Sequence, residues 1–463
     1  MQKSLTTGNP AKLILFFTFP LLIGNLFQQV YNLADTLIVG RTLGSDALAA
    51  VGSTGSIAFL IIGFAQGLTA GFSIVTAQHF GAQNEQGVRQ SVLTSVLLSG
   101  VITLLLTALS VVFARPVLEL IQTPDAVIGM SYDYIIIIYW GIGASVLFNL
   151  LSNIIRALGD SVTPLIFLVI ACLLNIGLDL LFIMVFHMGV GGAAWATVIA
   201  QVVSGVMCLF YMFKKFPILR FKRSEWKVGW SAVLSHLRVG LPMGFQSSII
   251  AIGAIILQSA INSLGTTVMA AHTAAQKVDM VATQPMMSFG MTMATFSAQN
   301  YGAGQYHRIR KGVRQCAVMS VGFSLLVGAM NITVGKYLVG LFLDHPTTEL
   351  LGYAQTYLTV NGALYFLLAM LFILRYTLQG LGKSFVPTVA GIMELFMRSF
   401  VAIVLAVPLG YTGVAFANPA AWLGSLIPLT IAYFLTMRAL RQPIESSERV
   451  GAIPESEEPT NRT

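Results

Sequence analysis

Long apolar segments, separated by short polar ones, make up most of the chain. A helix needs about 20 apolar residues to cross the hydrocarbon layer of a membrane. The segments are continuously apolar rather than alternating, which excludes a membrane β-barrel. Twelve spans are predicted, near residues 12–39, 47–76, 90–113, 132–154, 164–187, 193–212, 239–262, 267–293, 314–335, 353–376, 387–408 and 415–437. The pattern therefore predicts an all-α membrane protein with twelve transmembrane helices.

The composition of the chain supports the prediction of a membrane protein. Only 10% of the 463 residues are charged and 56% are hydrophobic, whereas a soluble domain carries about 25% charged residues. The cysteines Cys172, Cys208 and Cys316 lie in or beside apolar segments and show neither metal-ligand spacing nor a disulfide framework. The first span is too long, and lacks the cleavage site, to be a signal peptide.

The basic residues indicate an orientation. If the chain starts in the cytoplasm, most of its 26 Lys and Arg fall in cytoplasmic loops, Arg156 and Arg375 among them, and only Arg41, Arg115 and Lys336 fall outside. We therefore expect a multi-pass membrane protein with both termini in the cytoplasm. The net charge of +8 needs no nucleic-acid partner, because loop cations face anionic lipid.

The chain also repeats itself once. Its first half contains short motifs that recur at a constant offset in the second half: Leu43-Gly44, Ala49-Ala50, Ala77-Gln78 and Gly81-Ala82 return as Leu264-Gly265, Ala270-Ala271, Ala298-Gln299 and Gly302-Ala303. Each half holds six predicted spans, so both enter from the same side and form parallel repeats. Such repeats are typical of transporters whose halves move around a site between them. An old duplication kept only for structure is the alternative.

The repeat and the polar segments divide the chain. We predict a pseudo-symmetric pair of six-helix lobes, with the N-terminal lobe at residues 1–212 and the C-terminal lobe at 239–440. A cytoplasmic basic linker at 213–238 joins them. The acidic tail at 441–463 is predicted to be disordered.

Ionisable residues inside predicted spans mark candidate functional sites, because they are costly there. Asp35 lies late in the first span, and Asn175 and Asp179 lie one turn apart on the fifth. No Lys or Arg lies in the core of any first-half span, so the acids have no obvious basic partner. A coupled carboxyl pair can bind and release a proton. Alternatively, a hard cation such as sodium takes oxygen ligands, which these residues and Thr197 supply. A hydrated, structural Asp35 is the third interpretation.

The ionisable residues inside the spans of the second half include cations as well as acids. Glu394 and Arg398 are one turn apart in a favourable order for an ion pair, and Lys277 and Asp279 lie on the eighth span. Cross-pairing between these two spans is plausible, and a structural charge network at Glu394 and Arg398 is the preferred interpretation. A polar wall of a substrate cavity is the alternative.

A cavity for varied apolar ligands is expected to use flexible methionines and amide groups. Pro20, inside the first span, is predicted to act as a hinge, with a static kink as the alternative. Gly63, Gly67 and Gly71, spaced four apart, are expected to allow close helix packing. The predicted substrate-cavity residues are Gln28, Tyr31, Asn32, Gln66, Met243, Lys277, Asp279, Gln284 and Met287.

From about residue 10 to 440 the chain resembles the multidrug and toxic compound extrusion (MATE) family, in its DinF-like prokaryotic branch. Several short motifs, in their order and repetition, carry the resemblance: Asn25-x-x-Gln28-x-x-Tyr31-Asn32-x-x-Asp35, Gly44-x-x-Ala47-Leu48-Ala49-Ala50, Ala77-Gln78-x-x-Gly81-Ala82, Arg156-Ala-Leu-Gly159-Asp160, Asn175-x-x-x-Asp179 and Gly189-x-x-Gly192-Ala193-Ala194.

This resemblance implies a cation-coupled antiporter that exports organic, often cationic amphiphilic small molecules by alternating access. It implies a coupling-cation site at Asp35, Asn175, Asp179 and Thr197, with a proton or sodium ion as the coupling ion, and no other metal or cofactor. The other expected partners are membrane lipids, and we expect a monomer. Other members keep an acid early in the seventh span, where this chain reads Leu241-Pro242-Met243, so a second-lobe cation site is in doubt.

A flippase, an intramembrane enzyme and an ATP-driven transporter are the alternative functions. A flippase for a lipid-linked oligosaccharide would be expected to carry a markedly cationic central cavity, whereas this first lobe is acidic and the second is balanced. An intramembrane enzyme is disfavoured, since no H-E-x-x-H motif is present, and the absence of a Walker A loop argues against ATP-driven transport. We therefore expect a transporter and not an enzyme, with its coupling ion and substrate range left open.

Overall fold

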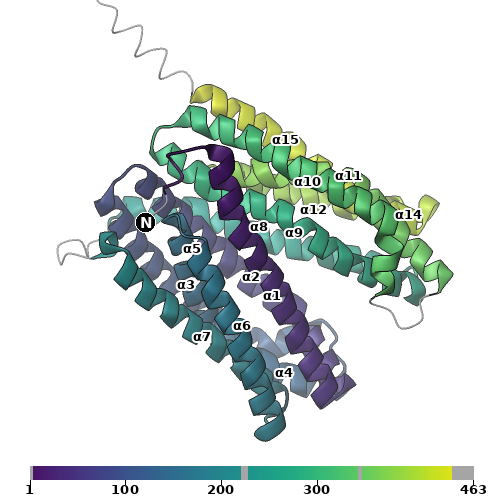
Figure 1. Ribbon diagram of the computed structural model, residues 1–463. Helices are drawn as coiled ribbons and strands as arrows, with labels where there is room; N and C mark the ends of the chain where they lie inside the picture. Colours follow the sequence, from purple (N-terminus) through teal and green to yellow (C-terminus); the bar gives the residue numbers. More distant parts are fainter. Residues whose placement is uncertain (1–3, 221–227, 342–346, 441–463) are drawn as a thin grey trace, which may run out of the picture.

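The computed structural model describes residues 4–220, 228–341 and 347–440, and every regular element in these ranges is helical. The first half contains α1 (Pro10–Leu43), α2 (Ser45–Gly81), α3 (Glu85–Leu120), α4 (Asp125–Trp140), α5 (Ile142–Ala157), α6 (Val162–Leu180) and α7 (Gly189–Lys215). The second half contains α8 (Trp230–Asn262), α9 (Thr266–Gly302), α10 (Tyr306–Gly340), α11 (Thr348–Gly380), α12 (Phe385–Val404), α13 (Ala406–Leu409), α14 (Tyr411–Ala415) and α15 (Ala417–Ala439). Figure 1 shows them as two bundles that diverge from one end.

The helices account for the predicted spans. In the part of the chain that the structure describes, ten helical segments are long and apolar enough to cross a membrane, and α4 with α5, bent by 45°, make an eleventh. The 37-residue α9 is too polar to meet the same test, but it fills the place of the predicted eighth span. The all-α membrane fold is therefore confirmed.

Glycine turns explain two of the repeated motifs. Gly44 joins α1 to α2 with φ 90°, and Gly265 joins α8 to α9 with φ 101°. Side chains other than glycine rarely adopt this left-handed backbone. The repeated Leu-Gly pair therefore marks the same tight turn in each half.

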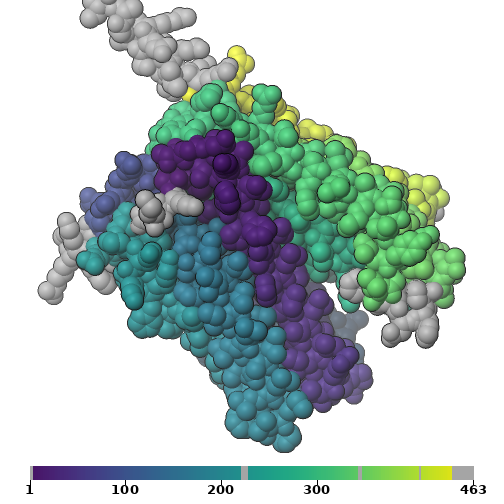
Figure 2. Space-filling view, viewed as in Figure 1, coloured from purple at the N-terminus to yellow at the C-terminus, as the bar shows by residue number. Residues whose placement is uncertain are grey.

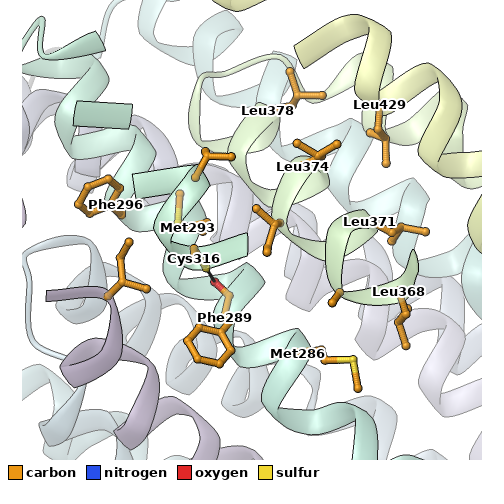
Figure 3. Close-up of a cluster of buried hydrophobic side chains, with 14 of the residues drawn as sticks. Met286, Phe289, Met293, Phe296, Cys316, Leu368, Leu371, Leu374, Leu378 and Leu429 are labelled. Carbon is orange, nitrogen blue, oxygen red and sulfur yellow. Dashed lines mark hydrogen bonds between the residues drawn. The ribbon is translucent and has the colours of Figure 1, made fainter. Parts of the chain in front are cut away.

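The core of the second bundle is a cluster of buried side chains from α9, α10, α11 and α15, shown in Figure 3. Phe289, Met293 and Phe296 of α9 lie beside Cys316 of α10 and leucines of α11. Ile14 and Phe17 of α1 belong to the same cluster. The first half of α1 therefore packs on the second bundle, although it belongs to the first repeat.

The two bundles meet at one end through glycines. A Cβ atom at Gly81 would lie 1.9 Å from the carbonyl oxygen of Gln299, and one at Gly302 would lie 1.9 Å from that of Gln78. Gln78 Nε2 also donates to the Gly380 carbonyl at 2.9 Å, and Gln299 Nε2 donates to that of Ala157 at 2.8 Å. These reciprocal contacts, made by residues of the sequence repeat, define what we call the closed end.

At the opposite end, which carries the Gly44 and Gly265 turns, the bundles separate, and Figure 2 shows the space between them. We call it the open end. Between the two ends, α2 packs closely on α8. A Cβ at Gly67 would lie 2.4 Å from the Met243 carbonyl oxygen and one at Gly71 2.5 Å from Gly240 Cα, which confirms the predicted close packing at these two glycines.

The segment that joins the halves is partly helical. The helix α7 runs to Lys215, a short 3-10 turn covers Pro217–Leu219, and α8 begins at Trp230. The first turns of α8 therefore lie within the stretch 213–238 that the sequence assigns to the linker. Residues 221–227 and the predicted acidic tail at 441–463 lie outside the described residues.

Candidate functional site

A polar cluster in the first bundle contains all four residues of the predicted cation site. Asp35 comes from α1, Asn175 and Asp179 come from one face of α6, and Thr197 comes from α7. Asn175 and Asp179 are fully buried. Directly after Asp179, α6 continues as a π-helical turn, Leu181–Val185, a feature that is frequent at functional sites.

Hydrogen bonds hold the cluster together. Oriented to satisfy both of its neighbours, the Asn175 amide donates to Asp179 Oδ2 at 3.0 Å and accepts from the Thr197 backbone N–H at 3.2 Å. The Tyr31 hydroxyl donates to Thr197 Oγ1 at 3.1 Å. Tyr31, predicted as a cavity residue, is therefore part of the carboxylate cluster.

The two acids face one another. Asp35 and Asp179 lie within hydrogen-bonding reach of each other, and Oδ1 of each is buried without a partner. In the described ranges, no Lys or Arg forms an ion pair with either acid. Two neighbouring buried carboxylates cannot both stay ionised at low cost unless a proton or a cation lies with them. The arrangement can therefore take up one positive charge.

The predicted substrate-cavity residues differ in their exposure. Asn32, Gln66 and Lys277 are exposed on α1, α2 and α9, Gln28 and Met287 are half-buried, and Gln284 is buried. Only Met243 lines the cavity of about 60 Å³ that lies between the bundles. Pro20 lies inside α1, which continues as one helix from Pro10 to Leu43.

The Asp279 carboxylate, in the second bundle, accepts hydrogen bonds from hydroxyl groups. Tyr365 and Tyr357 of α11 both donate to the Asp279 carboxylate, the latter at 3.4 Å. Asn331 in turn donates to the Tyr365 hydroxyl at 3.0 Å and Asn418 to the Tyr357 hydroxyl at 3.1 Å. Among the described residues Asp279 forms no ion pair with Arg398, and the hydroxyls of two tyrosines of α11 contact its carboxylate instead.

Glu394 lies between two arginines. The Arg398 guanidinium donates to Oε1 at 2.9 Å, as the one-turn spacing predicts, and Arg375 donates to Oε2. The sequence places Arg375 in a cytoplasmic loop, and this is wrong: α11 extends to Gly380 and leaves only 4% of Arg375 exposed. The charge network thus holds two cations and one anion.

Glu394→Gln is therefore expected to destabilise the protein. It leaves Arg375 and Arg398 buried without a counter-charge, and breaking a buried ion pair costs about 3–5 kcal/mol. Thermal unfolding of the detergent-purified variant should show a clearly lowered Tm. Glu119→Gln, which removes the exposed partner of Arg115, should leave the Tm within a degree or two, and equal Tm values for both variants would contradict the assignment.

Comparison with known proteins identifies the fold. The MatE family model matches residues 20–181 and 242–412, one segment in each repeat. The chain belongs to the MatE family. It is 28% identical to "Probable multidrug resistance protein YpnP" of Bacillus subtilis (strain 168) over 85% of this chain and 88% of that protein. It is 23% identical to the "FAD transporter" of Shewanella oneidensis over 94% of this chain and 96% of that protein.

Solved MATE structures share the architecture. One, described as the outward-facing conformation of a multidrug resistance MATE family transporter of the MOP superfamily, superposes with a TM-score of 0.88 at 23% identity and covers 95% of this chain and 98% of its own. Another, of a MATE protein in the bent conformation, gives 0.87 at 23% identity with the same coverage. The chain is thus a multi-pass membrane protein with the MATE fold.

Proposed function

We propose that this MATE protein is a secondary antiporter that exports organic, often cationic amphiphilic molecules in exchange for an inward flow of cations. The observation that carries the proposal is the pairing of half-buried Asp35 with fully buried Asp179, without a basic partner in the part of the chain that the structure describes. Unpaired acids inside a membrane protein are typical of ion pathways. The two-bundle fold supplies the mobile halves that alternating access needs.

In the proposed orientation both termini lie in the cytoplasm of a bacterial inner-membrane protein, so the closed end is cytoplasmic and the structure is outward-facing. A cation enters from the open end and reaches Asp35 and Asp179. Its binding neutralises the pair and changes the relative free energies of the two conformations. Substrate and cation couple because each binds the two conformations with different affinity.

The proton is the coupling ion that the cluster favours. The Asn175 carbonyl already accepts from the Thr197 N–H, and Thr197 Oγ1 already accepts from Tyr31. Oδ1 of each acid is buried without a partner, which suits a proton shared between the two, whereas hard cations take several oxygen ligands. A proton needs only the two facing carboxyls, which can share it.

The test is efflux of ethidium from proteoliposomes that carry the purified protein, under a proton gradient and a sodium gradient imposed separately. We expect the proton gradient to drive transport and the sodium gradient, at equal pH on both sides, to have little effect. Transport with sodium alone would assign the site to sodium, and transport with neither gradient would contradict cation-coupled antiport.

A further inference from the structure

The cavity between the bundles lies near the closed end, since Ala77 and Arg156 are among its walls. Its walls come from α1, α2, α5, α8, α9 and α11. They consist of Phe17, Leu21, Ala70, Ser73, Ile74, Ala77, Asn153, Arg156, Met243, Met291, Ala294, Thr295 and Tyr376. Its volume of about 60 Å³ exceeds the ~10–15 Å³ that one water needs. It can therefore hold a small ionic group.

Arg156, in the last turn of α5, brings a positive charge to this cavity. Its Nη1 donates to Asn153 Oδ1 at 3.2 Å, and its Nε is buried without a partner. Within the described ranges the guanidinium forms no ion pair, and no acidic residue is among those that line the cavity. A guanidinium has five N–H donors, so most of them are left for a ligand.

The other polar groups of the cavity suit the same ligand. Thr295 and Tyr376 line it, and in the described part of the chain neither hydroxyl has a hydrogen-bond partner. Hydroxyls can donate to an anion alongside a guanidinium. The remaining walls are apolar, mainly Phe17, Leu21 and Met291. Charged donors within an apolar enclosure fit a molecule that has an anionic head and an apolar body.

The second repeat does not reproduce this charge. Gln379 occupies the position equivalent to Arg156 in the repeat and donates to Gln246 Oε1 at 2.7 Å. Both amide side chains are buried. The cavity is thus cationic on one side only, which gives a bound anion one preferred orientation.

We propose that Arg156 anchors the anionic head group, a carboxylate, sulfonate or phosphate, of an amphiphilic ligand in the cavity between the bundles. The proposal deepens the function proposed above, on which it rests for the role of the ligand as a substrate. It extends the substrate class from cationic to anionic amphiphiles. Because the cavity adjoins the closed end, opening of that end exposes Arg156 to the cytoplasmic side, where an exporter takes up its substrate.

The test uses two probes of equal chain length and opposite charge, octanesulfonate and octyltrimethylammonium, both below their micelle concentrations. Binding is measured by isothermal titration calorimetry on the full chain in phosphatidylcholine nanodiscs, with empty nanodiscs subtracted. Arg156→Gln is expected to weaken octanesulfonate binding by about tenfold or more, the size expected for hydrogen bonds to a charged group, and to leave octyltrimethylammonium binding unchanged. Arg156→Lys should retain part of the affinity.

Arg115→Gln is the matched control, because it removes one exposed arginine whose ion-pair partner among the described residues is Glu119 on α3. It should bind both probes like the wild type. Unchanged octanesulfonate affinity in folded Arg156→Gln, or equal losses for both probes, would overturn the anion site. The binding measurement needs no ion gradient. It therefore tests the anion site independently of the efflux assay, which tests cation-coupled antiport.

Discussion

Replacing Asp179 with asparagine is expected to abolish gradient-driven efflux while leaving the protein folded. The amide has nearly the same shape as the carboxyl and can still contact Asn175, but it cannot bind and release a proton near neutral pH. Asp35→Asn removes the other half of the pair and should have the same effect. Ethidium efflux from proteoliposomes under a proton gradient should fall to the level of protein-free vesicles in both variants.

The control is Asp46→Asn, which changes an exposed acid in the first turn of α2 at the open end. Its efflux should equal that of the wild type. Size-exclusion profiles and Tm values establish that the two inactive variants are folded. Export at the wild-type rate by Asp35→Asn and Asp179→Asn would remove the pair from the coupling mechanism.

The second large effect is expected at the closed end, with Gly81→Ala. The added Cβ would lie 1.9 Å from a backbone carbonyl oxygen of α9, which cannot move aside as a flexible side chain could. The ends of α2 and α9 must therefore separate, and the closed end should open. Because the lobes are then biased toward one conformation, transport is expected to fall by about tenfold or more, the effect of a bias of roughly 1.4 kcal/mol or more.

Spin-label distances can measure this opening. Labels at Gln86 and His307, two exposed positions near the closed end on opposite bundles, are attached after the three native cysteines have been replaced. Gly81→Ala should shift their distance distribution to longer values. Gly100→Ala, where the added Cβ meets nothing within 4 Å, should leave it unchanged, and the same distribution in both variants would show that the glycine contact does not hold this end together.

Local signals in the sequence were enough to predict the spans, the repeat and the individual acids inside the spans. Charged residues in the middle of apolar runs are visible without a structure, and the one-turn spacing of Asn175 and Asp179 already places them on one face of a helix. The apposition of Asp35 to them required the fold, because α1 and α6 are far apart in the chain.

The residues that sequence reasoning misplaced lie at the ends of helices or on distant ones. Arg375 follows an apolar run and so looks like a loop residue, yet α11 continues to Gly380 and buries it. The sequence does not indicate that Tyr357 and Tyr365 contact Asp279, because they lie on another helix, 78 and 86 residues further along the chain. Such partners are set by helix packing rather than by spacing along the chain.

The polarity of α9 has a consequence for biosynthesis. A segment with Lys277, Asp279 and several amides has little tendency to insert into the membrane by itself. Its buried faces lie against α10, α11 and α1, two of which emerge from the ribosome after it. We therefore expect the nascent segment to enter the bilayer together with those later helices rather than alone.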